Sequence, residues 1–214
     1  MISKYLLFAS VLATCSLAPP LRAEVAEKTD ASFVTRATAS VAAEPRAVWL
    51  ALTRPGEWWS DEHSWSGDAG NMTLVPQAGG CFCERIPGTG DIPMDGSAKH
   101  AEVVQSVPDK ALRLRGEFGP LQAFPVNGVL TISLKEIDGG TAIGWEYYVG
   151  GAMPFDVDRI APAVDQVMNQ QLAGLRDHLG GLEDGSDGEE AVSDGSPDSP
   201  SETDGNSGSE ENHR

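Results

Sequence analysis

The chain has 214 residues, enough for one ordinary domain with additional segments, and its 40% hydrophobic and 22% charged residues are typical of a globular core. The formal net charge is -17, and residues 182–214 hold eleven acidic side chains against a single Arg214. Neither this tail nor the rest of the chain carries the Lys/Arg face that phosphate binding requires, so nucleic acid is excluded as a partner.

The N-terminal segment has the pattern of a secretory signal peptide over residues 1–23. Lys4 supplies a positive charge, residues 5–18 form an apolar run too short to span a bilayer, and Leu21-Arg22-Ala23 offers a cleavage site. We therefore expect a periplasmic or secreted product with no integral membrane span, in which residues 24–31 form a linker. Two alternatives stay open: lipoprotein processing at Cys15, and an N-terminal core helix.

The first elements of the domain are a strand and a short helix. Residues 33–41 are rich in β-branched and small side chains, which favours a strand. Pro45 suits the first turn of a helix, and the apolar residues that follow it recur at helical spacing up to residue 52. The sequence Arg54-Pro55-Gly56 ends that helix, and a polar loop with three tryptophans follows.

Short strand-like segments separated by turn signals occupy residues 72–149. We expect strands over 72–75, 81–86, 98–107, 111–116, 128–137 and 141–149, with Asp138-Gly139-Gly140 as a hairpin turn. Even spacing and short connections predict an antiparallel meander. No internal repeat is visible in the sequence.

The longest predicted helix spans residues 158–179, with Asp158 or Asp156 as its N-cap and Gly180-Gly181 at its end. Its apolar stripe must be buried, and the concave face of a curved sheet is the surface that can bury it. These elements predict an α+β domain. The stripe consists of Ile160, Val164, Val167, Met168, Leu172, Leu175 and Leu179.

Residues 182–214 are acidic and rich in Ser, Gly and Pro, with almost no apolar side chains. Such a segment cannot bury enough surface to offset its ordering entropy, so we expect a disordered acidic tail. A solvated tail is the simplest interpretation; weak cation binding and tethering of a partner are the alternatives.

Across residues 32–181 the chain resembles the SRPBCC/START-like (Bet v 1-like) superfamily, in its bacterial polyketide cyclase/lipid transport or Hsp90-ATPase-activator-like branch. The resemblance implies a helix-grip fold: a curved antiparallel sheet of about seven strands, wrapped around a long C-terminal helix, with a cavity between them. It implies no single activity, because one fold hosts many functions. The export signal argues against an intracellular co-chaperone. The resemblance is carried by Trp58-Trp59, His63, Ser66-Gly67-Asp68, Gly79-Gly80-Cys81-Phe82-Cys83-Glu84, His100, Leu112-Arg113-Leu114, Gly119-Pro120-Leu121-Gln122, residues 147–151 and Val164-Asp165.

An aromatic-rich interior is expected to line that cavity and to bind a small apolar molecule. Alternation along the last strand places Trp145 and Tyr147 on the inner face, opposite Glu146 and Tyr148. Ordinary core packing is the alternative interpretation of these aromatics. The predicted ligand-binding residues are Trp58, Trp59, Trp65, Phe82, Glu84, His100, Phe118, Leu121, Phe124, Trp145, Tyr147, Val164, Met168 and Leu172.

The candidate catalytic residues are Glu84, His100 and Tyr147. If Phe82 points inward, Glu84 points inward with it and needs a partner, and His100 on the next strand is one candidate. Such a pair is either a general acid/base or ligand-orienting dyad, or a structural salt bridge. The pattern leaves open which face of its strand His100 occupies.

Cys81 and Cys83 share one strand face, and positions i and i+2 of a strand lie near the outer limit for a disulfide. We therefore expect two free thiols, with a strained disulfide in an oxidising compartment as the alternative. With His100, and with His63 as a further member, they form a weak zinc candidate. No cofactor is predicted, since phosphate-binding and dinucleotide fingerprints are absent from the sequence.

The leading functional hypothesis is a non-enzymatic carrier or sensor for a small hydrophobic ligand. The alternatives are an enzyme of the cyclase/hydratase kind that uses Glu84, His100 or Tyr147 in the same cavity, and a protein–protein interaction module.

Overall fold

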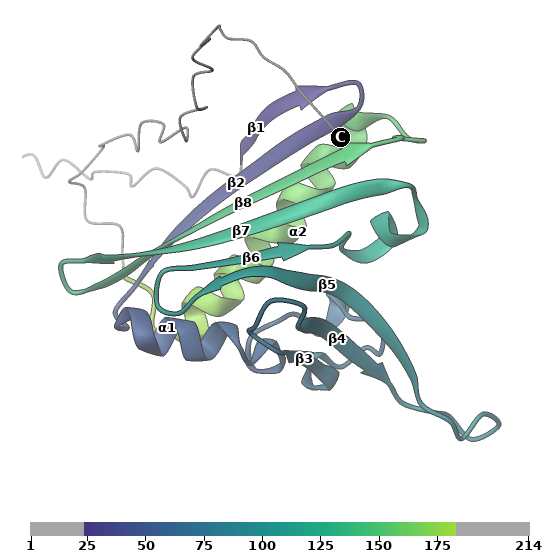
Figure 1. The fold of residues 1–214 in the computed structure, drawn as a ribbon, viewed down its shortest axis with the longest axis horizontal. Helices are drawn as coiled ribbons and strands as arrows, with labels where there is room; N and C mark the ends of the chain where they lie inside the picture. The colour runs from purple at the N-terminus through teal and green to yellow at the C-terminus, as the bar shows by residue number, and fades with distance from the viewer. Residues whose placement is uncertain (1–23, 183–214) are drawn as a thin grey trace, which may run out of the picture. The chain divides into compact units, whose positions relative to one another are not determined.

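A computed structural model describes residues 24–182. The predicted signal peptide with Cys15 and the acidic tail from residue 183 onward lie outside the described residues. The described part contains one antiparallel sheet with the strand order β1-β2-β8-β7-β6-β5-β4-β3 (Figure 1). Its strands are β1 (Glu24–Thr29), β2 (Ser32–Val41), β3 (Met72–Leu74), β4 (Cys81–Ile86), β5 (Gly96–Val107), β6 (Ala111–Arg115), β7 (Val126–Ile137) and β8 (Gly140–Gly151).

The sheet has eight strands in the described residues, one more than the predicted seven or so. The additional strand is β1, which forms where a linker was expected. Glu27, Lys28 and Thr29 pair in antiparallel register with β2 across a tight turn, so this edge segment forms backbone hydrogen bonds with the sheet on one side. The linker prediction was wrong because residues 24–29 have little hydrophobic alternation, the signal by which a strand is predicted. This segment is a strand because it pairs with β2.

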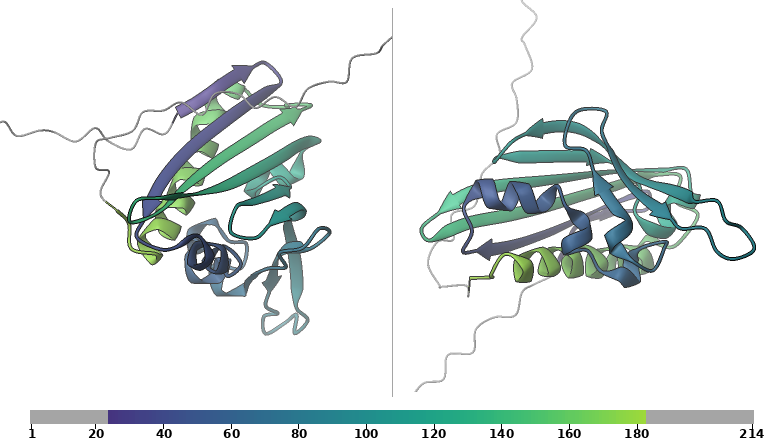
Figure 2. Two further views of the ribbon diagram at one scale, coloured as in Figure 1. Left: turned by 60° about the vertical axis from the view of Figure 1, so that its left-hand side comes forward. Right: turned by 90° about the horizontal axis from the view of Figure 1, so that it is seen from below.

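Two α-helices lie on one face of this curved sheet, α1 (Pro45–Leu52) and α2 (Val157–His178) (Figures 1 and 2). Of the two predicted caps for α2, Asp156 is the one used: its carboxylate accepts from the backbone N–H of Asp158 at 2.9 Å. Four short 3-10 helices complete the described elements, at Pro55–Glu57, Asp61–His63, Ala69–Asn71 and Gly119–Ala123. The fold is therefore the expected α+β helix-grip arrangement.

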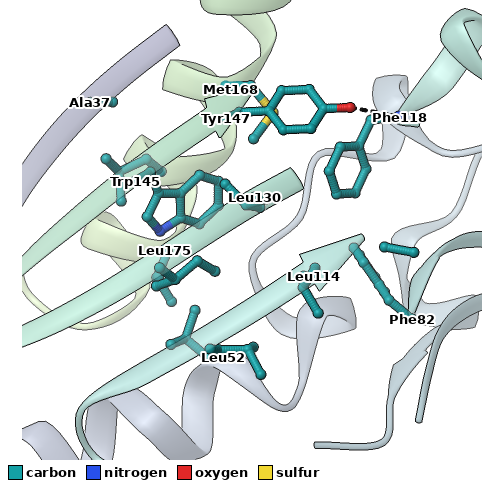
Figure 3. Close-up of a cluster of buried hydrophobic side chains, with 14 of the residues drawn as sticks. Ala37, Leu52, Phe82, Leu114, Phe118, Leu130, Trp145, Tyr147, Met168 and Leu175 are labelled. Atoms are coloured by element: carbon teal, nitrogen blue, oxygen red, sulfur yellow. Dashed lines mark hydrogen bonds between the residues drawn. The ribbon is translucent and has the colours of Figure 1, made fainter. Parts of the chain in front are cut away.

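The inner face of the sheet follows the predicted alternation. Ile143, Trp145 and Tyr147 on β8 are 0–3% exposed, whereas Tyr148 is 42% exposed. Figure 3 shows side chains from the sheet, from α1 and from α2 gathered into one apolar cluster. The inner-face assignment of Trp145 and Tyr147 is confirmed.

Helix α2 behaves differently along its length. Leu172 and Leu175 in its C-terminal half are fully buried, and the apolar void near Trp58 and Trp145 has a volume of only about 20 Å³. Ile160 and Val164 in the N-terminal half are only partly buried. The interior is therefore filled at one end of the helix and open at the other.

A β-bulge in β5 decides the direction of His100. In the pairing with β4, Phe82 faces Ala101 and Cys83 faces Lys99, so His100 is an extra residue without a partner in the register. Because of this insertion, His100 and Ala101 both point inward, with exposures of 3% and 1%. In a regular strand only one of two consecutive residues points inward. For this reason the sequence pattern did not decide which face of β5 His100 occupies.

Cys81 and Cys83 form a disulfide, contrary to the expected free thiols. That expectation assumed a regular strand, in which positions i and i+2 lie about 6.6 Å apart. Their Cα atoms are 5.3 Å apart here, at the point where β4 faces the bulge in β5. This separation lies well inside the usual disulfide range, whereas that of a regular strand lies near its upper limit.

Candidate functional site

A cavity of about 430 Å³ lies where α2 is open toward the sheet. Three segments surround it: the loop after Trp58, the short helix near Pro120, and the N-terminal half of α2, with His100 of β5 as a further wall. The lining residues are mostly apolar: Trp59, Glu62, His63, Ser64, Trp65, His100, Phe118, Gly119, Pro120, Leu121, Ile160, Ala163, Val164, Val167 and Met168. Trp65, with 49% of its surface exposed, stands at the mouth of the cavity.

The loop that forms one wall is fixed to both helices. The indole N–H of Trp58 donates to the carbonyl of Ala51 in α1 at 2.9 Å. On the other side, the backbone N–H of Ser60 donates to Oε1 of Gln171 in α2, also at 2.9 Å. Gln171 is fully buried, and the sequence analysis missed it because a glutamine beside an apolar stripe looks like a boundary position. These two hydrogen bonds hold the wall at a set distance from α2.

Glu84 is a buried carboxylate with three hydrogen-bond donors around it. The backbone N–H groups of Trp65 and Ser66 donate to its two oxygens at 3.0 and 2.5 Å, and His100 Nε2 lies 2.9 Å from Oε2. Burial opposes ionisation, but hydrogen bonds from Ser66, Trp65 and His100 outweigh it and hold the pKa of Glu84 below its usual value. Glu84 therefore fixes the loop at the cavity mouth and orients His100 at the same time.

His100 connects this carboxylate to the cavity. Its ring contacts Phe82, with ring centroids 5.2 Å apart, and lines the cavity. The predicted Glu84–His100 pair is thus present, with side-chain exposures of 0% and 3%. A histidine held by a buried carboxylate can exchange a proton with a bound molecule or orient it through a hydrogen bond.

Tyr147, the third catalytic candidate, does not face the cavity. Its hydroxyl donates to the carbonyl of Gly116 at 3.0 Å. The same hydroxyl accepts from the backbone N–H of Phe118 at 3.3 Å (Figure 3). Burial raises the pKa of this phenol well above its usual value. Because both hydrogen-bonding functions are used by the backbone, Tyr147 positions the segment that carries Phe118 and is not a group for ligand contact.

Of the predicted ligand-binding residues, Glu84 and Tyr147 lie behind the cavity wall and outside its lining, and the others fall into three groups. Those on the cavity wall are Trp59, Trp65, His100, Phe118, Leu121, Val164 and Met168. Trp58, Phe82 and Trp145 surround the small void in the filled part of the interior, and Leu172 lies in the core. Phe124 is 37% exposed and packs edge-to-face on Phe155, away from the cavity lining.

His63 and Ala163 are lining residues that the sequence analysis missed. His63 was considered only as a family motif and as a further member of the zinc candidate, yet it lines the cavity, and within residues 24–182 its buried Nδ1 has no hydrogen-bond partner. The signal that could have identified it is its place two residues before Trp65, which was itself predicted to bind the ligand. Ala163 lies beside the predicted apolar stripe. If α2 packed closely along its whole length, Ala163 would face solvent, so the sequence pattern did not mark it as a lining residue.

The structure does not assemble the zinc candidate. Cys81 and Cys83 are joined in a disulfide, and they lie on the face of β4 opposite to Glu84, the partner of His100. In the described part of the chain, no group of three or more His, Cys, Asp or Glu side chains has the arrangement of a metal site. No helix within residues 24–182 has the length and hydropathy needed to cross a membrane.

Comparison with known proteins gives one family and a common fold. Residues 32–180 match the model of the family described as polyketide cyclase/dehydrase and lipid transport. A solved protein of Rhizobium leguminosarum is similar in structure, with 16% identity, a TM-score of 0.52, and coverage of 69% of this chain and 94% of that protein. A protein of Rhizobium loti is similar with 17% identity, a TM-score of 0.50, and coverage of 69% and 97%. No curated protein matches the sequence.

Proposed function

The chain belongs to the polyketide cyclase/dehydrase and lipid transport family of the SRPBCC superfamily, and on that basis we propose that it is a carrier or sensor for a small hydrophobic ligand. The observation that carries the proposal is the cavity of about 430 Å³ between the N-terminal half of α2, the loop after Trp58 and the short helix near Pro120, with its mostly apolar wall and the buried Glu84–His100 pair at its edge. Ligand sites of small molecules are generally apolar clefts of roughly 300–1,000 Å³ with a few oriented polar groups.

The proposal includes export. The charge and apolar run of residues 1–23 support a signal peptide, and the Cys81–Cys83 disulfide is compatible with an oxidising compartment. Cell fractionation with N-terminal sequencing tests this part. A mature protein that begins near Glu24 in the periplasm or medium is expected; a cytoplasmic protein that retains residue 1 refutes export.

Blocking the cavity tests the binding function. Ala163 lines the cavity and is itself exposed, so Ala163→Trp places a large ring in the mouth without entering the core. Gln166→Trp is the matched control, because it adds the same ring to an exposed position of α2 outside the lining. We expect an apolar fluorescent dye to bind the wild type and the control with similar affinity and Ala163→Trp at least about tenfold more weakly, as loss of the apolar contact area predicts. Equal affinities for all three proteins refute the assignment of the cavity as the binding site.

A cyclase- or hydratase-like enzyme is the second candidate, and the Glu84–His100 pair at the cavity wall is the observation that favours it. An imidazole backed by a carboxylate can take a proton from a bound molecule and return it elsewhere. Native mass spectrometry of the purified protein first identifies the bound molecule. An enzyme with His100→Gln would bind it but leave it chemically unchanged, whereas a carrier leaves it unchanged in the wild type as well.

A further inference from the structure

The hydrogen-bond network around Glu84 determines where the protons are. Two of its three donors are backbone N–H groups, of Trp65 and Ser66, and a backbone N–H cannot act as an acceptor. Both oxygens of Glu84 accept from a backbone N–H, and Oε2 also lies against His100, an arrangement that favours the ionised side chain. Together with its lowered pKa, this makes Glu84 a carboxylate with no proton to offer to His100.

The proton between Glu84 and His100 then belongs to the histidine. His100 Nε2 lies 2.9 Å from Oε2 of Glu84, so Nε2 carries the hydrogen and donates it. A neutral imidazole has one N–H only, which leaves Nδ1 as an acceptor with an unshared pair. Within residues 24–182, no hydrogen bond to Nδ1 is present, and the ring is buried, with 3% exposure, and lines the cavity.

The charges near the cavity select against anionic ligands. Its lining contains the carboxylate of Glu62 and no Lys or Arg among the described residues, and Glu84 lies directly behind His100. The N-terminus of α2 lies outside the cavity lining, and Asp156, as its cap, and Asp158, paired with Lys28, occupy the position where a helix dipole would otherwise favour an anion. A carboxylate ligand facing Nδ1 would meet an unshared electron pair and would add a negative charge with no cation in the wall to balance it.

We propose that the ligand is a neutral, largely apolar molecule whose hydroxyl group donates a hydrogen bond to Nδ1 of His100. This inference rests on the proposed binding function and adds the chemical class: an alcohol or phenol, in preference to an ether, a ketone or a fatty acid. His100 is then the residue that determines specificity, and Glu84 is the positioning residue that fixes its tautomer.

Isothermal titration with four biphenyls at about pH 8 tests the inference. The probes are biphenyl, 4-phenylphenol, 4-methoxybiphenyl and biphenyl-4-carboxylate. We expect the phenol to bind about tenfold or more tightly than the ether, as one buried hydrogen bond predicts, and the carboxylate to bind most weakly. Equal binding of phenol and ether, or preferential binding of the carboxylate, overturns the inference. If biphenyl and all its derivatives fail to bind, the proposed function itself fails.

Two variants link the preference to the network. His100→Phe keeps a ring in place but removes Nδ1, so it should bind biphenyl like the wild type and lose the preference for the phenol. Glu84→Gln keeps one oxygen; where this oxygen accepts from Ser66, the amide nitrogen lies beside Nε2 and donates to it, so the histidine proton moves to Nδ1 and the preference should shift toward the ketone 4-acetylbiphenyl.

A spectroscopic measurement on the wild type keeps the test independent of the folding of these variants. Nitrogen NMR of histidine-labelled protein should show Nδ1 of His100 without a proton, and its signal should move when 4-phenylphenol binds. A protonated Nδ1 in the free neutral protein contradicts the inference whatever the variants do.

Discussion

Replacement of Glu84 by Gln should be a strongly destabilising change whose size depends on pH. The wild-type carboxylate accepts from Trp65, Ser66 and His100 at 3.0, 2.5 and 2.9 Å. Glutamine keeps one oxygen, and its amide N–H₂ group must face at least one of these donors. Hydrogen bonds to a charged group contribute roughly 1.5–3 kcal/mol each, and the smaller desolvation cost of a neutral amide offsets part of the loss. We expect Glu84→Gln to lower the free energy of unfolding by about 2–4 kcal/mol near pH 7.

The pH dependence follows from the lowered pKa of Glu84. Because its pKa in the folded state lies below that in the unfolded chain, its stabilising contribution is present above the unfolded value of about 4.3. That contribution is lost as the pH falls through the folded value. The difference between the wild type and Glu84→Gln should therefore be largest near neutral pH and should shrink below about pH 4.

Urea unfolding followed by tryptophan fluorescence at about pH 7 and about pH 3.5 measures both effects. Glu102→Gln is the matched control: Glu102 is exposed on β5 and forms a surface ion pair with Lys99, so its loss should cost about 0.5 kcal/mol or less. A Glu84→Gln effect no larger than that of the control, or one of equal size at both pH values, would refute the assigned network.

Three further changes test other parts of the structure. Asp165 is buried with one side-chain oxygen unpartnered among the described residues, and burial raises its pKa, so its charge destabilises the fold fully above the pKa of the folded state and not at all in acid. Asp165→Asn should therefore raise the free energy of unfolding by about 1 kcal/mol or more near pH 7. An unchanged or lower free energy of unfolding contradicts this. A Cβ at Gly174 would lie 2.4 Å from the carbonyl oxygen of Trp58, so Gly174→Ala should lower the melting temperature although alanine has the higher helix propensity; a higher melting temperature refutes this close contact. The Cys81–Cys83 disulfide closes a loop of only about three residues, and the chain-entropy relation predicts that it stabilises the fold by about 1.6 kcal/mol. Replacing both cysteines by serine should therefore lower the free energy of unfolding by no more than about 2 kcal/mol. A clearly larger loss in chemical unfolding would show that the disulfide also supports β4 and its neighbour.

Local patterns in the sequence were sufficient for the architecture. Alternation along β8 identified the inner face with Trp145 and Tyr147, and the spacing of apolar residues identified α2 and its cap region. Both signals are reliable because each depends only on the spacing of apolar residues within one helix or one strand. The motifs around Trp58-Trp59 and residues 79–84 pointed to the family that the sequence match supports.

The candidate site depended on features that no single element encodes. The direction of His100 follows from a bulge in the pairing of β4 with β5, and the sequence of β5 alone cannot show where a register shift occurs. Tyr147 lies on the predicted inner face, but its hydroxyl is hydrogen-bonded to the backbone of Gly116 and Phe118 and does not reach the cavity.

The position of the cavity is likewise a tertiary property. The stripe of α2 looks uniform in sequence, but Gln171 and Gly174 bring the Trp58–Ser60 segment against its C-terminal half, while the N-terminal half stays open. Periodicity in the sequence thus identified the inner face of β8 and the apolar stripe of α2, but not the buried His100 and Gln171. Only the long-range packing of a loop, a bulged strand and one helix decided which residues surround empty space, because a void depends on the distances between elements and not on the pattern within any of them.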